Sequence, residues 1–167
     1  MNNPPTEPVT TYIALGSNLA SPVSQIKSAR SAIAATDGIS EQAFSSLYQS
    51  LPMGPQDQPN YVNAVMACST ILAPLTLLHC LQAIEKSHGR VRKNERWGAR
   101  TLDLDIVLYG SQVIDLPELT IPHSGLCERS FVLYPLHEIA PGLIIPGKGA
   151  IADLLAHCPL AGLQRLD

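Results

Sequence analysis

The spacing of apolar residues over the first forty positions predicts a strand and then an amphipathic helix. The run "TYIALGSN" from Thr11 is short and apolar, as in a buried strand, and Gly16 ends it. Ser21 as N-cap and Pro22 in the first turn then begin a helix. Apolar residues recur at helical spacing from there down to Gly38, where we expect the helix to have ended.

The same alternation of elements continues in the next fifty positions. Residues 39–50 have an extended pattern, and residues 51–60, "LPMGPQDQPN", form a loop that is long for a connector. The run "YVNAVMACSTI" from Tyr61 predicts another strand. A helix begins at Pro74, carries leucines and an isoleucine on one face, and has Gly89 as its C-cap.

A basic loop and the strand-like run "TLDLDIVLYG" from Thr101 follow this second helix. The resulting order is strand, helix, strand, strand, helix, strand, which is typical of an α+β fold with a ferredoxin-like βαββαβ core. We expect a mainly antiparallel sheet with helices packed on it. An irregular segment up to His123, a short helix over 128–138, and a last strand and helix after Pro141 extend the core.

Length and composition limit the classes of protein that this chain can be. With 167 residues, 46% of them hydrophobic, the chain can form one compact domain, which we expect over residues 11–167 after a flexible tail at 1–10. A net charge of −3 creates no field that would attract nucleic acid or an anionic membrane. The start "MNNPPTEPVT" does not resemble a signal peptide, and no apolar run approaches ~20 residues. We expect a cytoplasmic monomer.

Four cysteines are spread along the chain without a CxxC pair: Cys68, Cys80, Cys127 and Cys158. Three of them lie within apolar patterns. This usage favours buried free thiols in a reducing compartment over disulfides or a zinc site.

The run from Thr101 is unusual because a strand-like pattern carries two aspartates. Alternation of side chains puts one set on a single face: Thr101, Asp103, Asp105, Val107 and Tyr109. The other face receives Leu102, Leu104, Ile106 and Leu108. Two carboxylates about 7 Å apart repel each other by about 2 kcal/mol at an effective dielectric constant of about 20, so a positive charge should lie nearby. That charge is either an arginine beside each aspartate or Mg²⁺, which commonly joins one or two carboxylates to substrate phosphates.

A dense group of cations precedes these aspartates. It comprises Arg90, Arg92, Lys93, Arg96 and Arg100. One interpretation is a solvated loop. The other is a phosphate-binding segment, because guanidinium groups beside metal-bound carboxylates would suit a metal–polyphosphate complex. Trp97 within this loop is either a core anchor or a stacking surface for a flat ring.

Other candidate motifs add little. The stretch "GLIIPGKGA" has the spacing of a P-loop, but Gly149 stands where that motif needs Ser or Thr, so we reject it. His79, His88 and His157 lie in or at the end of helical patterns and are expected to be structural. His123, in "IPHSG", is the histidine that could bind phosphate from an irregular loop.

Taken together, these motifs resemble the 6-hydroxymethyl-7,8-dihydropterin pyrophosphokinase family of folate biosynthesis. The resemblance runs nearly the whole chain, through "YIALGSN", "GPQDQPNYVNA", "GRVRKNERWGARTLDLDIVLYG", "IPH" and "RSFVLYPLHEIAP". It implies a compact α+β enzyme that transfers the pyrophosphoryl group of ATP to the pterin's hydroxymethyl oxygen and releases AMP. It also implies two Mg²⁺ ions as cofactors.

The resemblance further implies site residues, position by position. The metal ligands would be Asp103 and Asp105, which with Arg90 and Arg92 form the catalytic set. The positions that contact ATP would be Gln82, Arg90, Arg92, Trp97, Arg100, Ile106, His123 and Arg129. The positions around the pterin would be Ser50, Met53, Tyr61, Asn63, Trp97, Asp103 and Phe131.

Some details remain open at this stage. Glu85 matches a family position near the site, although a glutamate at a helix end can equally be solvated. Ser124 and Gly125 stand where relatives often carry an aromatic or basic residue. No dedicated base is evident, so catalysis should depend on positioning and electrostatics.

Two other functions compete with this reading. One is a module that binds single-stranded nucleic acid through the basic, Trp-containing loop, although Asp103 and Asp105 would repel a phosphate backbone unless they bound a metal. Salt-dependent binding of oligonucleotides without release of AMP from ATP would distinguish it. The other is a metal-dependent nucleotide hydrolase, which would form AMP without a pterin.

Overall fold

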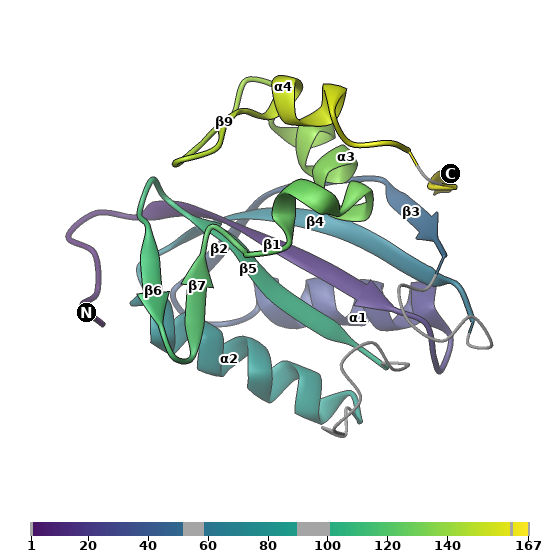
Figure 1. Cartoon of the computed structure of the whole chain (residues 1–167). Helices are drawn as coiled ribbons and strands as arrows, with labels where there is room; N and C mark the ends of the chain where they lie inside the picture. Colours follow the sequence, from purple (N-terminus) through teal and green to yellow (C-terminus); the bar gives the residue numbers. More distant parts are fainter. Residues whose placement is uncertain (1, 52–58, 90–100, 161, 167) are drawn as a thin grey trace.

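The structure of the chain is a computed structural model that describes residues 2–51, 59–89, 101–160 and 162–166. An antiparallel sheet forms the middle layer, with two helices on each side of it (Figure 1). The predicted α+β class is therefore confirmed.

The main sheet has six strands among the described residues. They are β1 (Val9–Ser17), β2 (Ile39–Phe44), β3 (Leu47–Ser50), β4 (Tyr61–Thr70), β5 (Asp103–Tyr109) and β10 (Gln164–Leu166). Their order is β10-β3-β4-β1-β5, and β2 also pairs with β4. Both β2 and β3 pair with β4, so together they correspond to the second strand of the βαββαβ core. With this correspondence, the strand order is that of a ferredoxin-like core.

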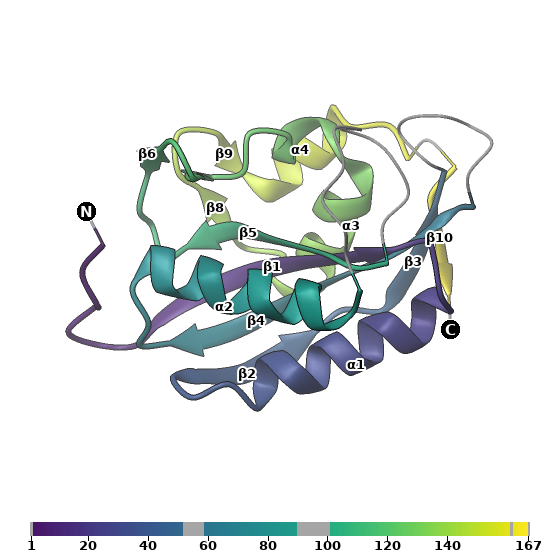
Figure 2. The same ribbon diagram turned by 90° about the horizontal axis from the view of Figure 1, so that it is seen from below.

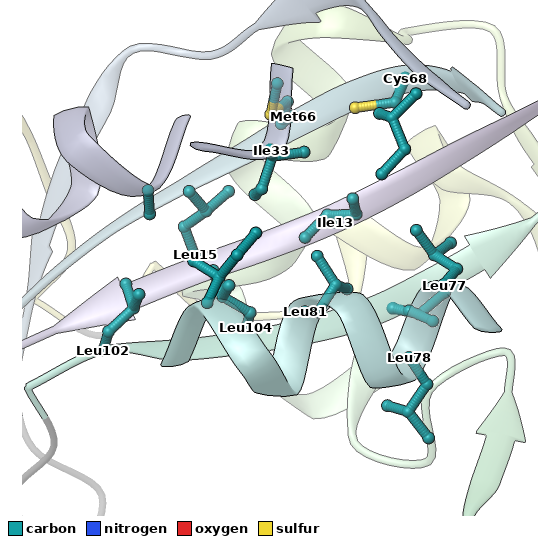
Figure 3. Close-up of a cluster of buried hydrophobic side chains, with 14 of the residues drawn as sticks. Ile13, Leu15, Ile33, Met66, Cys68, Leu77, Leu78, Leu81, Leu102 and Leu104 are labelled. Atoms are coloured by element: carbon teal, nitrogen blue, oxygen red, sulfur yellow. The ribbon is translucent and has the colours of Figure 1, made fainter. Parts of the chain in front are cut away.

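Helices α1 (Pro22–Ala34) and α2 (Pro74–Ser87) lie side by side on one face of the sheet, as Figure 2 shows. Their apolar stripes bury the main core, in which Leu81 packs beside Ile13 and Leu104 (Figure 3). Both helices begin with proline, as predicted. Ser21 occupies the N-cap position of α1, as predicted, but it has a φ of 62° and its side chain makes no capping hydrogen bond.

The opposite face of the sheet is covered by α3 (Ser130–Ile139) and α4 (Ile151–Ala156), which lie above the sheet in Figure 1. A second core cluster forms there, with Leu133 of α3 and Ile151 of α4 against Val65 of β4. The two-residue strands β8 (Ile144–Ile145) and β9 (Gly149–Ala150) connect the two helices.

The segment before His123 is more regular than expected. It forms a hairpin of β6 (Ile114–Leu116) and β7 (Leu119–Ile121), followed by a 3₁₀ turn, η1 (Leu126–Glu128). The expectation of an irregular connection is wrong. Strands of three residues are too short for period-two alternation to be evident in the sequence.

Strand β5 contains a β-bulge that changes the predicted faces. Tyr12 of β1 pairs with Leu108 while Ile13 pairs with Ile106, so Val107 has no partner on β1. From the bulge onward the side chains change sides: Leu108 joins Val107 in the second cluster, and Tyr109 is buried in the main core. The prediction that Tyr109 shares a face with the aspartates is therefore wrong, because one extra residue shifts the alternation.

The start of the chain makes specific contacts. Strand β1 begins at Val9, two residues before the predicted start. Farther toward the terminus, the side-chain oxygen of Asn2 accepts a hydrogen bond of 2.8 Å from the backbone N–H of Leu75 in the first turn of α2. The residue at the N-cap of α2, Ala73, has no side-chain oxygen to do this.

All four cysteines are free thiols, as predicted, and Cys68 and Cys158 are buried. Burial and the nearby charge of Glu41 raise the pKa of Cys68 to about 12. Within the described residues no helix has the length and apolar character needed to cross a bilayer.

Candidate functional site

Polar residues from neighbouring strands meet on the α3 side of the sheet. Gly16 of β1 lies directly opposite Asn63 of β4 on one side and Asp103 of β5 on the other. A Cβ atom added to Gly16 would lie 3.2 Å from Oδ1 of Asn63. Glycine at this position therefore lets the Asn63 amide lie close to the backbone of β1, where any side chain would crowd it.

The amide of Asn63 is hydrogen-bonded to the neighbouring strand β3. Its Nδ2 donates a hydrogen bond of 2.8 Å to Oγ of Ser50 on β3, and both residues are buried. Tyr61, which pairs with Ser50 across β3 and β4, is half-buried next to them. Since one amide hydrogen is committed to Ser50, Oδ1 faces the space above Gly16 as an acceptor.

Asp103 and Asp105 lie on the same face of β5, as the alternation predicts, and both are half-buried. Burial and the charge of Asp103 raise the pKa of Asp105 well above its usual value, although Arg129 opposes the shift. The two carboxylates therefore disfavour each other's charge, and a bound cation would stabilise both.

Glu85 increases this concentration of negative charge. It is 3% exposed at the C-terminal end of α2, and its Oε2 accepts a hydrogen bond of 2.8 Å from the backbone N–H of Leu104. Its charge also contributes to the raised pKa of Asp105. Glu85 is therefore buried behind β5, between the two aspartates along the strand, rather than solvated.

The bulge in β5 places His123 beside Asp105. The carbonyl of Val107 accepts a hydrogen bond of 3.1 Å from the backbone N–H of His123. Nε2 of the imidazole lies 3.8 Å from Oδ2 of Asp105, and Nδ1 accepts a hydrogen bond of 3.0 Å from the N–H of Gly125. Burial and the charge of Arg129 lower the pKa of His123, which favours the neutral ring.

Arg129 and Phe131 lie at the start of α3. The guanidinium carbon of Arg129 is 5.9 Å from the centre of the Phe131 ring, and its charge acts on both Asp105 and His123. A Cβ atom on Gly125 would lie 2.6 Å from Nε of Arg129. The glycine that departs from the family pattern therefore makes room for this arginine.

Two of the proposed nucleotide-contacting residues lie away from this face. The side chain of Ile106 is buried in the main core among residues of α2, on the side of β5 opposite to the aspartates. Gln82 is half-buried on α2. Of Ile106, the backbone lies next to Asp105 in β5, whereas the side chain points to the opposite face.

Five of the proposed site residues lie outside the described residues, so their positions are not part of this geometry. They are Met53, Arg90, Arg92, Trp97 and Arg100.

Sequence reasoning assigned no role to two buried polar residues, Ser17 at the end of β1 and Asn18 directly after it. Ser17 is 0% exposed and Asn18 is 1% exposed, and they donate hydrogen bonds to the backbone carbonyls of Thr101, before β5, and Pro59, before β4. The available signal was a polar pair directly after the apolar run "YIALG". A polar pair at the end of a strand is also typical of a solvated turn, so the sequence alone does not distinguish the two.

The site contains donors and acceptors of several kinds but no protein-only metal centre. Among the described residues, no group of three or more His, Cys, Asp or Glu side chains is arranged to hold a metal ion. Two half-buried carboxylates on one face of a strand instead suit an ion whose remaining ligands are water or substrate oxygens.

Comparison with known proteins agrees with the resemblance. The family model described as 7,8-dihydro-6-hydroxymethylpterin-pyrophosphokinase (HPPK) matches residues 12–141. A 2-amino-4-hydroxy-6-hydroxymethyldihydropteridine pyrophosphokinase of Pseudomonas aeruginosa is 53% identical over 155 residues, covering 93% of this chain and 95% of the relative. The enzyme of the same description from Haemophilus influenzae is 52% identical over 147 residues, covering 88% and 91%.

A solved structure supports the fold. The crystal structure of Plasmodium falciparum HPPK-DHPS with pteroate superimposes with a TM-score of 0.72 at 13% identity, covering 94% of this chain and 43% of that one. Nothing in the comparisons favours a nucleic-acid-binding module.

Proposed function

Since the chain belongs to the 7,8-dihydro-6-hydroxymethylpterin-pyrophosphokinase family, we propose that it transfers the pyrophosphoryl group of ATP to the hydroxymethyl oxygen of the dihydropterin and releases AMP. The observation that carries the proposal at the level of residues is the row Asn63, Gly16, Asp103 across three neighbouring strands. This row places the amide of Asn63, which can hydrogen-bond to a heterocycle, on the same side of the sheet as the carboxylate of Asp103, which would hold the metal for pyrophosphoryl transfer.

The pterin binds at the Asn63 end of this row. Oδ1 of Asn63 accepts hydrogen bonds from the N–H groups on the edge of the heterocycle, while Nδ2 of the same amide donates to Oγ of Ser50. Tyr61 and Phe131 supply aromatic surfaces on the same side of the sheet. Met53 and Trp97 belong to this end by family resemblance.

The spacing of the strands orients the substrate. Asn63 and Asp103 are separated by two interstrand distances, or about 10 Å, with Gly16 between them. A two-ring heterocycle held at Asn63 therefore extends over Gly16 and points its hydroxymethyl arm toward Asp103. The reacting oxygen is thus brought to the aspartate pair by the edge contacts of the ring.

Asp103 and Asp105 are the residues that would hold Mg²⁺. Their oxygen ligands, shared face and mutual repulsion fit a hard divalent cation. When bound, magnesium supplies positive charge that neutralises the phosphate oxygens of ATP during transfer. Two ions, as in the family, would share these carboxylates with phosphate oxygens and water.

His123 and Arg129 bind phosphate oxygens on the same face. The Nε2–H of His123 is a neutral donor next to Asp105, and the guanidinium of Arg129 is a permanent cation at the start of α3. Arg90, Arg92 and Arg100 supply further positive charge by family resemblance, and Gln82 and Ile106 are nucleotide positions on the same basis.

Among the described residues, the geometry assigns no general base. Asp105, the carboxyl with a raised pKa, lies beside His123 and farther from the pterin end than Asp103. The rate enhancement comes instead from two effects. The site holds the hydroxyl and the phosphates in place, and it stabilises the charge that develops during transfer.

Product analysis tests the proposal. The protein is incubated with ATP, Mg²⁺ and 6-hydroxymethyl-7,8-dihydropterin, and AMP and the pterin diphosphate are separated by chromatography. We expect the two products in equal amounts, and no AMP when the pterin or Mg²⁺ is left out. AMP formed without the pterin would instead indicate a nucleotide hydrolase.

A further inference from the structure

We propose that Ser17 and Asn18 are positioning residues that set where the pterin-binding strand and the aspartate-bearing strand enter the site. Asn18 acts on β4, which carries Tyr61 and Asn63, and Ser17 acts on β5, which carries Asp103. The kinetic part of this inference rests on the proposed function, whereas its structural part does not.

The contact of Asn18 lies directly before β4. Its Nδ2 donates a hydrogen bond of 2.9 Å to the carbonyl of Pro59, two residues before Tyr61. Proline cannot donate a backbone hydrogen bond of its own, so its carbonyl is the backbone group through which this point of the chain can be held. The direction in which β4 starts, and with it the height of Tyr61 above the sheet, depends on this bond.

The contact of Ser17 lies at the equivalent place before β5. Its Oγ hydrogen-bonds to the carbonyl of Thr101, two residues before Asp103, and is also 3.3 Å from the carbonyl of Leu19. The two side chains thus act at matched positions, each two residues upstream of the first site residue of its strand.

Burial shows that these bonds are not incidental surface contacts. Ser17 is 0% exposed and Asn18 is 1% exposed, although neither belongs to an apolar cluster. A buried polar side chain must be hydrogen-bonded to be tolerated, and here the partners are backbone groups of two other segments. Replacing either side chain with alanine removes the buried donor and with it the bond that joins the end of β1 to the other segment.

The turn that follows supports a fixed geometry. Ala20 and Ser21 have φ values of 55° and 62°, a left-handed conformation that is uncommon for residues other than glycine. The turn is stabilised by a hydrogen bond of 3.1 Å from Nε2 of Gln25 to the carbonyl of Ala20. Ser17 and Asn18 are therefore held between the paired strand β1 and a constrained turn.

Hydrogen exchange read by mass spectrometry tests the structural part. We expect Asn18→Ala to increase amide exchange over residues 59–63 and Ser17→Ala to increase it over residues 101–105, each with a smaller effect on the other segment. A matched control is Thr70→Val. It removes a buried hydroxyl that bonds to the carbonyl of Gly38 over 2.9 Å at the far end of β4.

Steady-state kinetics test the functional part. We expect Asn18→Ala to raise the KM for the pterin by about 10-fold with kcat within about 3-fold, and Ser17→Ala to lower kcat by about 10-fold with the pterin KM little changed. Thr70→Val should leave both constants near wild type even if it lowers the melting temperature equally.

Two results would overturn the inference. One is uniform exchange across both segments in each variant, and the other is a kinetic change no larger than that of Thr70→Val. If an alanine variant does not fold, Asn18→Asp and Ser17→Cys, which keep the size of the side chain and weaken or remove the donor, replace it with the same expectations. If wild-type protein makes no pterin diphosphate, the proposed function fails while the exchange experiment still decides the structural claim.

Discussion

The backbone N–H of Gly125 donates a hydrogen bond of 3.0 Å to Nδ1 of His123. Nδ1 must therefore be unprotonated, and the single hydrogen of the neutral ring is on Nε2, the atom that lies 3.8 Å from Oδ2 of Asp105. The fold thus fixes the tautomer that presents a donor to the site.

Replacing His123 should weaken the phosphate side of the site. We expect His123→Ala to lower kcat/KM for ATP by about 10- to 100-fold, because a preorganised donor to phosphate oxygen is lost. His123→Gln, which can place an amide N–H near the same point, should recover part of the loss. Equal defects in both variants would argue against a donor role, and steady-state kinetics with varied ATP measure the difference.

Gly125 should matter through Arg129. In a Gly125→Ala variant the new Cβ would lie 2.6 Å from Nε and 2.9 Å from Cζ of that arginine, so the guanidinium must move. We expect the KM for ATP to rise by about 10-fold, with little change in stability because the side chain is flexible. Gly142→Ala is the control, since nothing lies within 4 Å of a Cβ there.

Gly16 should control access of the pterin. A methyl group at this position would lie 3.2 Å from Oδ1 of Asn63 and would occupy the space over which the ring extends. We expect Gly16→Ala to weaken pterin binding by at least about 10-fold while ATP binding is unchanged. Titration of each ligand separately measures the two affinities, and equal affinities for the pterin in variant and wild type would place the ring elsewhere.

Stability should depend on pH through Glu138 of α3. Burial favours protonation of this carboxyl, but hydrogen bonds from Tyr48 and Ser46 and the charge of Arg165 outweigh it and lower the pKa below the usual 4.5. A carboxyl with a lowered pKa stabilises the fold above its unfolded-state pKa, and that contribution is lost as pH falls through the folded-state value.

Glu138→Gln should therefore lower the free energy of unfolding by about 1–3 kcal/mol at pH 7 and by less near pH 3. Urea denaturation at the two pH values measures the difference. Oε1 of Glu138 accepts a hydrogen bond of 2.6 Å from the Tyr48 hydroxyl, so Tyr48→Phe should reproduce part of the loss. A loss that is the same at both pH values would contradict an ionised Glu138.

The local parts of the site were predictable from sequence. Asp103 and Asp105 were placed on one face because alternation in a strand depends only on neighbouring residues. The same rule failed at Tyr109, because the bulge at Val107 depends on how β5 pairs with β1. The helices were found because Pro22 and Pro74 mark their first turns.

Contacts between distant segments could not be predicted. Whether Glu85 is solvated or buried depends on its meeting Leu104 across α2 and β5, and the sequence contains no sign of that contact. The role of Asn18 depends on Pro59, forty-one positions away. Resemblance to a family named the pterin, which neither charge nor periodicity could identify.

The role of the aspartate pair is tested most directly by the rate of pterin diphosphate formation in an Asp105→Asn variant at saturating ATP, Mg²⁺ and pterin. We expect a loss of at least about 10²-fold, because one of the two carboxylates proposed to bind magnesium is removed. The melting temperature should not fall, since the substitution also removes repulsion from Asp103. A rate near that of wild type would contradict the assignment of Asp103 and Asp105 as the site of magnesium-dependent transfer.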